Sequence, residues 1–214
     1  GSADQPSEDQ LADLLSLSDV MATGWHAARC ARVEPGHTVV VVGDGAVGLC
    51  GVLAAARQGA ERVIALSRHE PRQRLAREFG ATDVLAERGA DAEAAVLELT
   101  DGVGADAVLE CVGTEQSMDT AIAVARAGAT VGYVGLPHGV DLKPWRMFGR
   151  NIGIAGGVAP ARAYIEQLRA DVLAGEISPG KVFDLSLPLT EVAEAYAAMD
   201  ERRAIKTMLV PPAS

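Results

Sequence analysis

A run of valines leading into three regularly spaced glycines is the feature that most restricts the fold of this chain. Residues 38–51 read TVVVVGDGAVGLCG. The continuous valines predict a strand covered on both faces, as in a parallel sheet, and the small apolar residues after them predict a helix. This strand–turn–helix order is the setting in which a G-x-G-x-x-G pattern binds the pyrophosphate of a dinucleotide.

Each glycine of this loop has a separate predicted role. Gly43 permits the tight turn, Gly45 lets the backbone approach the pyrophosphate, and Gly48 lets the helix pack closely on the strand. Ala46 and Val47 lie at the helix N-terminus, where unpaired N–H groups and the positive end of the helix dipole favour an anion. The alternative is a glycine-rich turn that serves packing alone.

Strand and helix patterns alternate along most of the chain. Strands are predicted at residues 38–42, 62–67, 83–86, 105–112, 130–136, 151–157 and 206–210, and helices at 18–33, 46–59, 71–79, 91–100, 117–128, 161–174 and 190–200. The alternation predicts an α/β fold, a Rossmann doubly wound parallel sheet of about six strands with helices on both faces. Ser18 is the predicted N-cap of the helix that precedes the sheet.

Three parts of the chain are expected to differ in role. Residues 1–16 are expected to be an expression remnant and linker, and residues 17–157 to form the NAD(P)-binding Rossmann domain. Residues 158–214 are expected to form a C-terminal helix-strand tail.

Composition restricts the partners of the chain. Its 214 residues carry a formal charge of −10, which disfavours binding to a nucleic-acid backbone. No run of about 18 apolar residues indicates a membrane span, and the first residues lack the basic and apolar regions of a signal peptide. Three widely spaced cysteines indicate neither a disulfide framework nor a structural zinc site. We therefore expect a cytoplasmic protein with no nucleic-acid or membrane partner.

The end of the second predicted strand bears on which dinucleotide binds. NAD sites usually place Asp or Glu about 20 residues beyond the glycines, but Ser67 and Arg68 stand there. A hydroxyl and a guanidinium suit a 2′-phosphate, and Arg72 adds a second cation, so NADP(H) is favoured over NAD. The alternative is that Arg68 is a solvated loop residue. Asp44, inside the glycine loop, is expected to point to solvent.

Six segments carry a more specific pattern. They are SDVMATGWHAA, VEPGHTVVVVGDGAVGL, ALSRHEPRQRLAREFGATDVL, GADAVLECVG, ARAGATVGYVGLP and AIKTMLV. Together they resemble the zinc-dependent medium-chain alcohol dehydrogenase family over roughly residues 17–210. The Ser-Arg pair resembles the NADP-dependent secondary alcohol dehydrogenases of that family. The resemblance implies hydride transfer between an alcohol or carbonyl substrate and nicotinamide, with zinc acting as a Lewis acid.

The family's barrel-like catalytic domain, which supplies Cys and His ligands to the catalytic zinc, has no counterpart in this sequence. The resemblance therefore implies a cofactor-binding portion that is inactive alone and whose tail returns to the missing N-terminal catalytic domain. Asp19 matches the family's third zinc ligand, and we expect it to bind zinc only in the full-length parent. The alternative is a first-turn Asp that complements the helix dipole.

Further cofactor contacts follow from the resemblance. Thr23 is expected near the nicotinamide, Gly153 and Ile154 near its carboxamide, and Lys206 at the pyrophosphate. Two strand-end loops are expected to line the nicotinamide pocket, and their residues are Cys111, Val112 and Gly113, and Val134, Gly135 and Leu136. Each of these loops has the alternative of being only a strand-end turn. The four histidines are not expected to pair with a cysteine or carboxylate at ligand spacing.

Two other functions stay open at this point. One is a zinc-free quinone or enoyl reductase of the same superfamily, and the other is a non-catalytic nucleotide-binding module. The family commonly dimerises through the edge of the cofactor-domain sheet, so a homodimer through residues 130–136 is expected. The apolar terminal strand is expected to lack a sheet of its own, and either to dock locally or to be poorly ordered.

Overall fold

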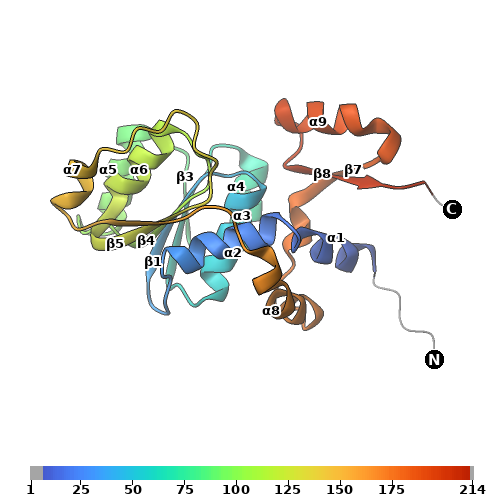
Figure 1. Cartoon of the computed structure of the whole chain (residues 1–214), viewed down its shortest axis with the longest axis horizontal. Coiled ribbons are helices and arrows are strands. Elements are labelled where there is room, and N and C mark those ends of the chain that lie inside the picture. Colours follow the sequence, from blue (N-terminus) through green and yellow to red (C-terminus); the bar gives the residue numbers. More distant parts are fainter. Residues whose placement is uncertain (1–6, 213–214) are drawn as a thin grey trace.

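The computed structural model describes residues 7–212. Six parallel strands form one sheet in the order β3-β2-β1-β4-β5-β6, flanked by helices (Figure 1). The strands are β1 (Thr38–Val42), β2 (Arg62–Leu66), β3 (Asp83–Leu85), β4 (Ala105–Glu110), β5 (Ala125–Tyr133) and β6 (Gly153–Gly156). This order, with the chain reversing direction across the sheet between β3 and β4, is that of a Rossmann fold. The predicted fold class is confirmed.

The valines of β1 explain why both faces of the sheet are covered. Successive side chains of a strand point to opposite faces. Val39 and Val41 are buried with helices α2 (Val20–Cys30) and α3 (Ala46–Arg57), whereas Val40 and Val42 are buried with α5 (Gly89–Leu99) and α6 (Glu115–Val124). Each valine of the run therefore belongs to a core, which places the glycine loop at the end of a strand that is buried on both faces.

The remaining elements complete the two layers and the tail. The other helices are α1 (Glu8–Ser16), α4 (Glu70–Glu78), α7 (Pro144–Phe148), α8 (Ala161–Leu173) and α9 (Val192–Asp200). The tail also contains two short 3-10 turns, η1 (Pro179–Val182) and η2 (Leu189–Glu191), and strands β7 (Phe183–Pro188) and β8 (Lys206–Val210). None of the helices within residues 7–212 combines the length and apolar character that crossing a bilayer requires.

Helix α1 lies in the stretch for which the sequence predicts only a remnant and linker. A capping box between Ser7 and Gln10 begins it, and buried Asp13 fixes it, because one carboxylate oxygen accepts a 2.6 Å hydrogen bond from the Gly180 amide. The predicted N-cap at Ser18 is wrong. Helix α2 begins after Asp19, and the Ser18 hydroxyl instead donates to the Leu15 carbonyl at 2.8 Å, at the end of α1.

Two predicted boundaries in the fifth βα unit also shift. The helix predicted to reach residue 128 ends at Val124, because Ala125 is already extended and pairs with Ala105 of β4. Strand β5 is consequently longer at its start than predicted. It lies between β4 and β6, so β6 is the outer strand and residues 130–133 are not an edge. The predicted dimer contact through residues 130–136 is therefore misplaced by one strand.

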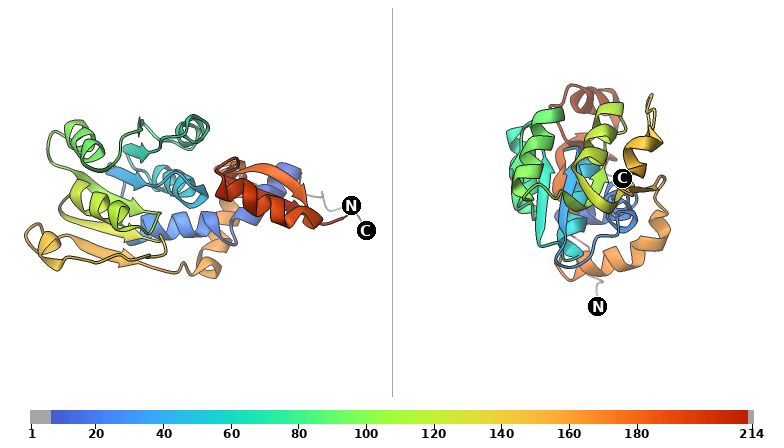
Figure 2. Two further views of the ribbon diagram at one scale, coloured as in Figure 1. Left: turned by 90° about the horizontal axis from the view of Figure 1, so that it is seen from above. Right: turned by 90° about the vertical axis from the view of Figure 1, so that its left-hand side faces the viewer.

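The terminal strand has a partner that the sequence did not predict. Strand β8 pairs in parallel with β7 in a separate two-stranded sheet, and α9 forms the crossover between them. This small βαβ unit lies at the end of the molecule opposite α7 (Figures 1 and 2). The expectation that the terminal strand lacks a sheet of its own is wrong, because β7, a short alternating run (FDLSLP) that was not predicted as a strand, pairs with it.

Candidate dinucleotide-binding site

The glycine loop has the geometry of a phosphate cradle. Gly43 has a φ of 117°, which favours glycine, and a Cβ on Gly48 would lie 2.0 Å from the Gly43 carbonyl oxygen. A Cβ on Gly45, by contrast, would meet nothing within 4 Å. Gly45 is also the N-cap of α3 and makes no side-chain cap, so the first amides of the helix have no capping side chain. The loop thus pairs open space with amide donors, which fits a pyrophosphate.

A pocket of about 440 Å³ opens beside this loop at the carboxyl ends of β1, β2 and β4. Its wall includes Gly43 and Gly45 of the loop, together with Cys111 and Val112 after β4. Parallel α/β sheets bind their ligands at this edge, where the strand order reverses. The pocket therefore lies where the sequence predicts a nucleotide.

Asp44 does not point to solvent, contrary to the sequence prediction. Its side chain is only 11% exposed and reaches the end of β2. One carboxylate oxygen accepts hydrogen bonds from the Ser67 hydroxyl at 2.9 Å and the Arg68 amide at 3.2 Å, and the other lies 3.4 Å from the Arg72 guanidinium. Burial opposes ionisation, but the Ser67, Arg72 and Arg68 contacts outweigh it and lower the pKa of Asp44 below its usual value. The carboxylate is therefore charged at neutral pH.

Four arginines line the same pocket, and two of them were not predicted. Arg68 and Arg72 were candidates from the sequence, whereas Arg88 and Arg202 were not. Arg88 follows β3 and precedes α5, so the rule that ligands meet strand carboxyl ends could have found it. Arg202 follows α9, and its approach depends on how the tail packs, which the predicted helix and strand at 190–200 and 206–210 do not fix. Among residues 7–212, Asp44 is the one acidic residue of the pocket wall, so positive charge predominates there.

The two predicted nicotinamide loops are in contact with each other. A Cβ on Gly113 would lie 2.1 Å from the Leu136 carbonyl oxygen, and one on Gly135 would lie 2.2 Å from the Gly113 nitrogen. Fully buried Glu110 holds the first loop, since its carboxylate accepts from the Val112 amide at 2.9 Å and the Gly113 amide at 2.8 Å. Sequence reasoning did not single out Glu110, although it ends a buried strand, where a charged residue is unusual.

A family model described as zinc-binding dehydrogenase matches residues 46–172, more than half of the chain. The chain belongs to this family. It is the zinc-type medium-chain alcohol dehydrogenase family that the sequence motifs resemble, and the match falls on its cofactor-binding portion.

Similar sequences and a similar solved structure support the same family assignment. A probable zinc-binding alcohol dehydrogenase of Mycobacterium tuberculosis is 36% identical over 88% of this chain and 48% of its own length. An NADP-dependent isopropanol dehydrogenase of Entamoeba histolytica is 32% identical over 92% of this chain and 54% of its own length. The solved alcohol dehydrogenase TADH from Thermus sp. ATN1 superposes with a TM-score of 0.86 at 27% identity, over 93% of this chain and 58% of that one. The chain thus spans about half the length of the curated relatives it matches.

Asp19 and Lys206, predicted for different ligands of this family, lie together. The Lys206 ammonium is 3.3 Å from the Asp19 carboxylate, which is 63% exposed. The Thr23 hydroxyl donates to the Asp19 carbonyl at 2.8 Å, one turn into α2. Within residues 7–212 no three His, Cys, Asp or Glu side chains gather as a metal site. The described residues by themselves therefore do not fit a catalytic zinc ion, and Asp19 could supply one ligand only.

The other predicted contacts lie outside the pocket. Gly153 and Ile154 begin β6 beside Thr130 and Val131, at the amino end of that strand rather than at the pocket edge. Ser67 reaches the pocket only through its bond to Asp44. The remaining predicted residues that do not line the pocket are Thr23, Ala46, Val47, Gly48, Gly113, Val134, Gly135, Leu136 and Lys206.

One histidine, His26, contacts a cysteine, although the sequence predicted no histidine–cysteine pair. On α2, the His26 ring lies 3.5 Å from the Cys30 sulfur, and its other side lies 2.8 Å from the Tyr164 hydroxyl of α8. Burial lowers the pKa of His26 and raises that of the Cys30 thiol, so both are neutral at pH 7. This group joins two helices on one face of the sheet.

Proposed function

We propose that this chain is the NADP(H)-binding portion of a zinc-dependent alcohol or carbonyl oxidoreductase. The observation that carries the proposal is the group of four arginines around the pocket, three that follow β2 and β3 and one, Arg202, that follows α9. A 2′-phosphate needs such donors, since guanidinium groups bind phosphate through charge-assisted hydrogen bonds. The naming of the Entamoeba histolytica relative as NADP-dependent is in line with it.

Each part of the site has a role in this proposal. The amides at the start of α3 and the open space at Gly45 receive the pyrophosphate. Lys206, which pairs with Asp19 in this structure, is proposed to add a cation there. Arg68, Arg72 and their neighbours receive the 2′-phosphate. The loops at 111–113 and 134–136 orient the nicotinamide and exclude water from one side of it. The chemistry gained on binding is hydride transfer at the nicotinamide ring.

Asp19 is proposed as one zinc ligand of the complete enzyme, with the other ligands contributed from outside this chain. Because the described residues bring no further ligands to Asp19, we expect no alcohol-dependent reduction of NADP by this chain alone. A catalytic domain that supplies the remaining ligands is the partner that this part of the proposal requires. The cytoplasmic location and the homodimer also stay predictions, and the dimer contact is now proposed at β6, the outer strand.

Calorimetric titration of the chain with NADPH and with NADH tests the cofactor. NADPH is expected to bind more tightly, and Arg68→Ala is expected to weaken NADPH by about 1.5–3 kcal/mol, the usual worth of a hydrogen bond to a charged group. Arg68→Ala should leave NADH nearly unchanged. Arg74→Ala is the matched control, because Arg74 pairs with Glu70 on the exposed side of α4. Equal affinities for the two cofactors, or tighter binding of NADH, would contradict the proposal.

A further inference from the structure

The Asp44 side chain lies at the end of β2, a place that its position in the sequence does not indicate. It belongs to the glycine loop after β1, yet its carboxylate contacts Ser67, Arg68 and Arg72 at the end of β2. In NAD-binding Rossmann folds the end of the second strand carries the Asp or Glu that accepts hydrogen bonds from the adenosine ribose. Asp44 therefore brings a carboxylate to that place from a neighbouring strand.

The two oxygens of Asp44 are unequally occupied. The Ser67 hydroxyl and the Arg68 amide both donate to Oδ2, whereas Oδ1 has only the 3.4 Å contact with Arg72. An ionised carboxylate offers about four lone-pair sites, so Oδ1 keeps capacity for a further donor. Asp44 also lines the pocket, which makes a ribose hydroxyl a suitable donor.

The same carboxylate opposes a 2′-phosphate. Asp44 and the phosphate would both be negative and would compete for the Arg72 guanidinium and the Ser67 hydroxyl. Arg88 and Arg202 line the pocket without bonding to Asp44, so they leave positive charge available for the phosphate. The wall therefore holds determinants for both cofactor types, one carboxylate and four guanidinium groups.

We propose that Asp44 is a specificity-determining residue that limits the preference of this site for the 2′-phosphate and lets it accept NAD(H) as well. The proposal rests on the proposed nucleotide function of the site, and it adds the residue that sets the ratio between the two cofactors. A purely structural role for Asp44, tying the loop to α4, would change the stability of the chain on substitution but not this ratio.

The test is Asp44→Asn, which removes the charge and keeps one oxygen for the Ser67 hydroxyl and the Arg68 amide. The probes are 2′,5′-ADP and 5′-AMP, which isolate the adenosine end, followed by NADPH and NADH. Removal of a negative charge a few ångströms from a phosphate is expected to raise the affinity for 2′,5′-ADP about tenfold, after allowance for solvent screening. The affinity for 5′-AMP should stay the same or fall.

Glu70→Gln is the matched control, because Glu70 lies in the first turn of α4 and pairs with Arg74 outside the pocket. It should leave the ratio of the two affinities within twofold of that of the wild type. Asp44→Ser, with a smaller hydroxyl acceptor, carries the test if Asp44→Asn unfolds. A ratio that is unchanged or lowered in the folded variant overturns the proposal.

The cofactor preference of the wild type tests the proposed function, and the affinity ratio in Asp44→Asn tests the role of Asp44. Tighter binding of NADH than NADPH by the wild type contradicts the proposed function, while a rise in the 2′,5′-ADP to 5′-AMP affinity ratio in Asp44→Asn still supports the role of Asp44. A wild type that prefers NADPH, with no rise in that ratio in Asp44→Asn, supports the proposed function and rejects the role of Asp44.

Discussion

At the scale of single residues, two glycines of one loop differ in the space available for a side chain. Gly48→Ala would place a Cβ 2.0 Å from the Gly43 carbonyl oxygen, so the backbone must move. We expect a loss of about 3 kcal/mol in the free energy of unfolding, at the upper end of overpacking effects. Gly45→Ala meets open space, but Gly45 is the N-cap of α3, where Ala is less favourable than Gly, so we expect a loss of no more than about 1 kcal/mol.

Titration with NADPH then separates the two glycines. Gly45→Ala should weaken NADPH binding by tenfold or more, on the order of 1.4 kcal/mol, because the added methyl occupies the space proposed for the pyrophosphate. Urea unfolding and calorimetry on the same samples check both statements. Normal NADPH affinity in a stable Gly45→Ala variant would show that this open space is not used by the ligand.

The backbone conformation of Arg202 bears on the stability of the chain, and its side chain bears on cofactor binding. Its φ is 61°, in the left-handed region that costs a residue with a Cβ about 1 kcal/mol. Arg202→Gly is therefore expected to raise the free energy of unfolding by about that amount, and at the same time to weaken NADPH more than NADH. Asn151→Gly is the control, because Asn151 has a φ of 54° and lies outside the pocket. It should stabilise the chain and leave both affinities unchanged.

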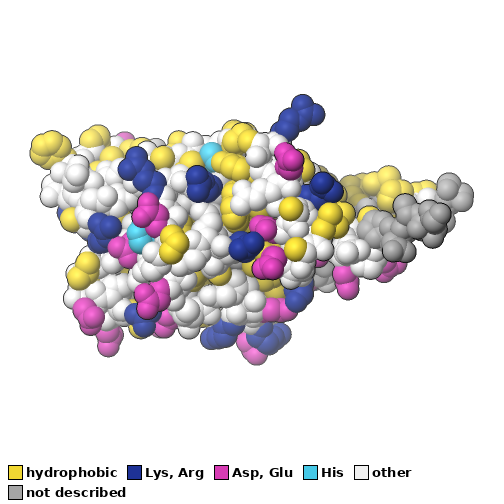
Figure 3. All heavy atoms as spheres, turned by 90° about the horizontal axis from the view of Figure 1, so that it is seen from below, with side chains coloured by type: hydrophobic (Ala, Val, Ile, Leu, Met, Phe, Trp, Pro, Cys, Tyr) yellow, Lys and Arg dark blue, Asp and Glu magenta, His cyan; other side chains and the backbone are white. Residues whose placement is uncertain are grey.

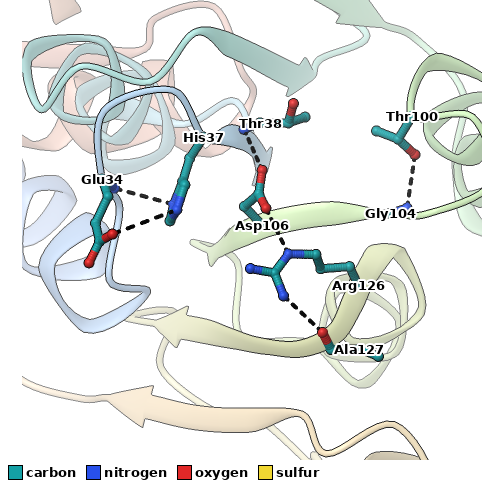
Figure 4. A network of polar contacts seen from close by, with 8 residues as sticks. All are labelled: Glu34, His37, Thr38, Thr100, Gly104, Asp106, Arg126 and Ala127. Atoms are coloured by element: carbon teal, nitrogen blue, oxygen red, sulfur yellow. Dashed lines mark hydrogen bonds and ion pairs between the residues drawn. The ribbon is translucent and has the colours of Figure 1, made fainter.

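At the scale of secondary-structure elements, Asp106 joins three strands at the end of the sheet away from the pocket (Figure 4). From β4 it accepts a 2.8 Å hydrogen bond from the Thr38 amide of β1 and a 2.7 Å bond from Arg126 of β5. Asp106→Ala leaves both donors without this partner. We expect it to lower the free energy of unfolding by about 1.5–3 kcal/mol at pH 7, and Glu98→Ala on the exposed side of α5 to lower it far less.

The Asp106 contacts also predict how this stabilisation depends on pH. Burial opposes ionisation of Asp106, but the bonds from Arg126 and Thr38 outweigh it and lower the pKa of the carboxyl group. A lowered pKa in the folded chain means that the stabilisation is complete above the unfolded value of about 3.9 and is lost as the pH falls through the folded value. The difference between wild type and Asp106→Ala in urea unfolding should therefore shrink below about pH 4. A difference that is independent of pH would contradict this account.

Elements with strong local signals could be predicted from the sequence, and those fixed by distant contacts could not. The strands β1, β2 and β4 are apolar runs, and the glycine loop between β1 and α3 has the spacing of its fingerprint. Helix α1 has a local signal, the capping box of Ser7 and Gln10, which the sequence prediction passed over, whereas its position depends on Asp13 meeting the Gly180 amide, 167 residues away.

The same contrast holds within the candidate site. The positions of Arg68 and Arg72 follow from the end of β2, which could be located from the sequence. The direction of the Asp44 side chain depends on which donors the neighbouring strand presents, and these are known only once the sheet has formed. Arg202 reaches the pocket only because β7, a short strand with no strong pattern, gives β8 a partner and so positions the turn after α9.

At the scale of the whole molecule, the chain is elongated, with α7 near one end of the six-stranded sheet and the β7–β8 sheet at the other end (Figure 2). Helix α1 packs on α8 and η1 and lies below the β7–β8 sheet in the view of Figure 1. On the face shown in Figure 3, acidic and basic side chains are intermixed, with hydrophobic ones between them. The charge on this face therefore does not indicate where a partner chain binds. The exposed strand edge and the aromatic side chains beside it are the features to test.

Strand β6 is one of the two outer strands of the large sheet, with β3 at the opposite edge, and its amino end joins exposed α7. The Ile152 amide just before β6 donates to the Met147 carbonyl of α7, and Trp145 and Phe148 on α7 are 73% and 89% exposed. An unpaired strand edge beside exposed aromatic side chains favours pairing with a second copy. We expect a homodimer through β6, with twice the mass of one chain in light scattering and slow hydrogen exchange at residues 153–156.

Phe148→Asp is the variant that tests this contact. Because Phe148 is so exposed in the single chain, its replacement should leave the unfolding of the monomer almost unchanged, while a buried charge at a dimer contact should shift the mass to that of one chain. Tyr196→Asp on α9, at the opposite end of the molecule, is the matched control and should keep the dimer mass. A wild type that stays monomeric at high concentration would overturn the dimer, and a Phe148→Asp variant that stays dimeric would place the contact elsewhere. Fast exchange at Ile154 in a dimer of normal mass would likewise exclude β6 as the paired edge, because amides of a paired strand are protected by their hydrogen bonds.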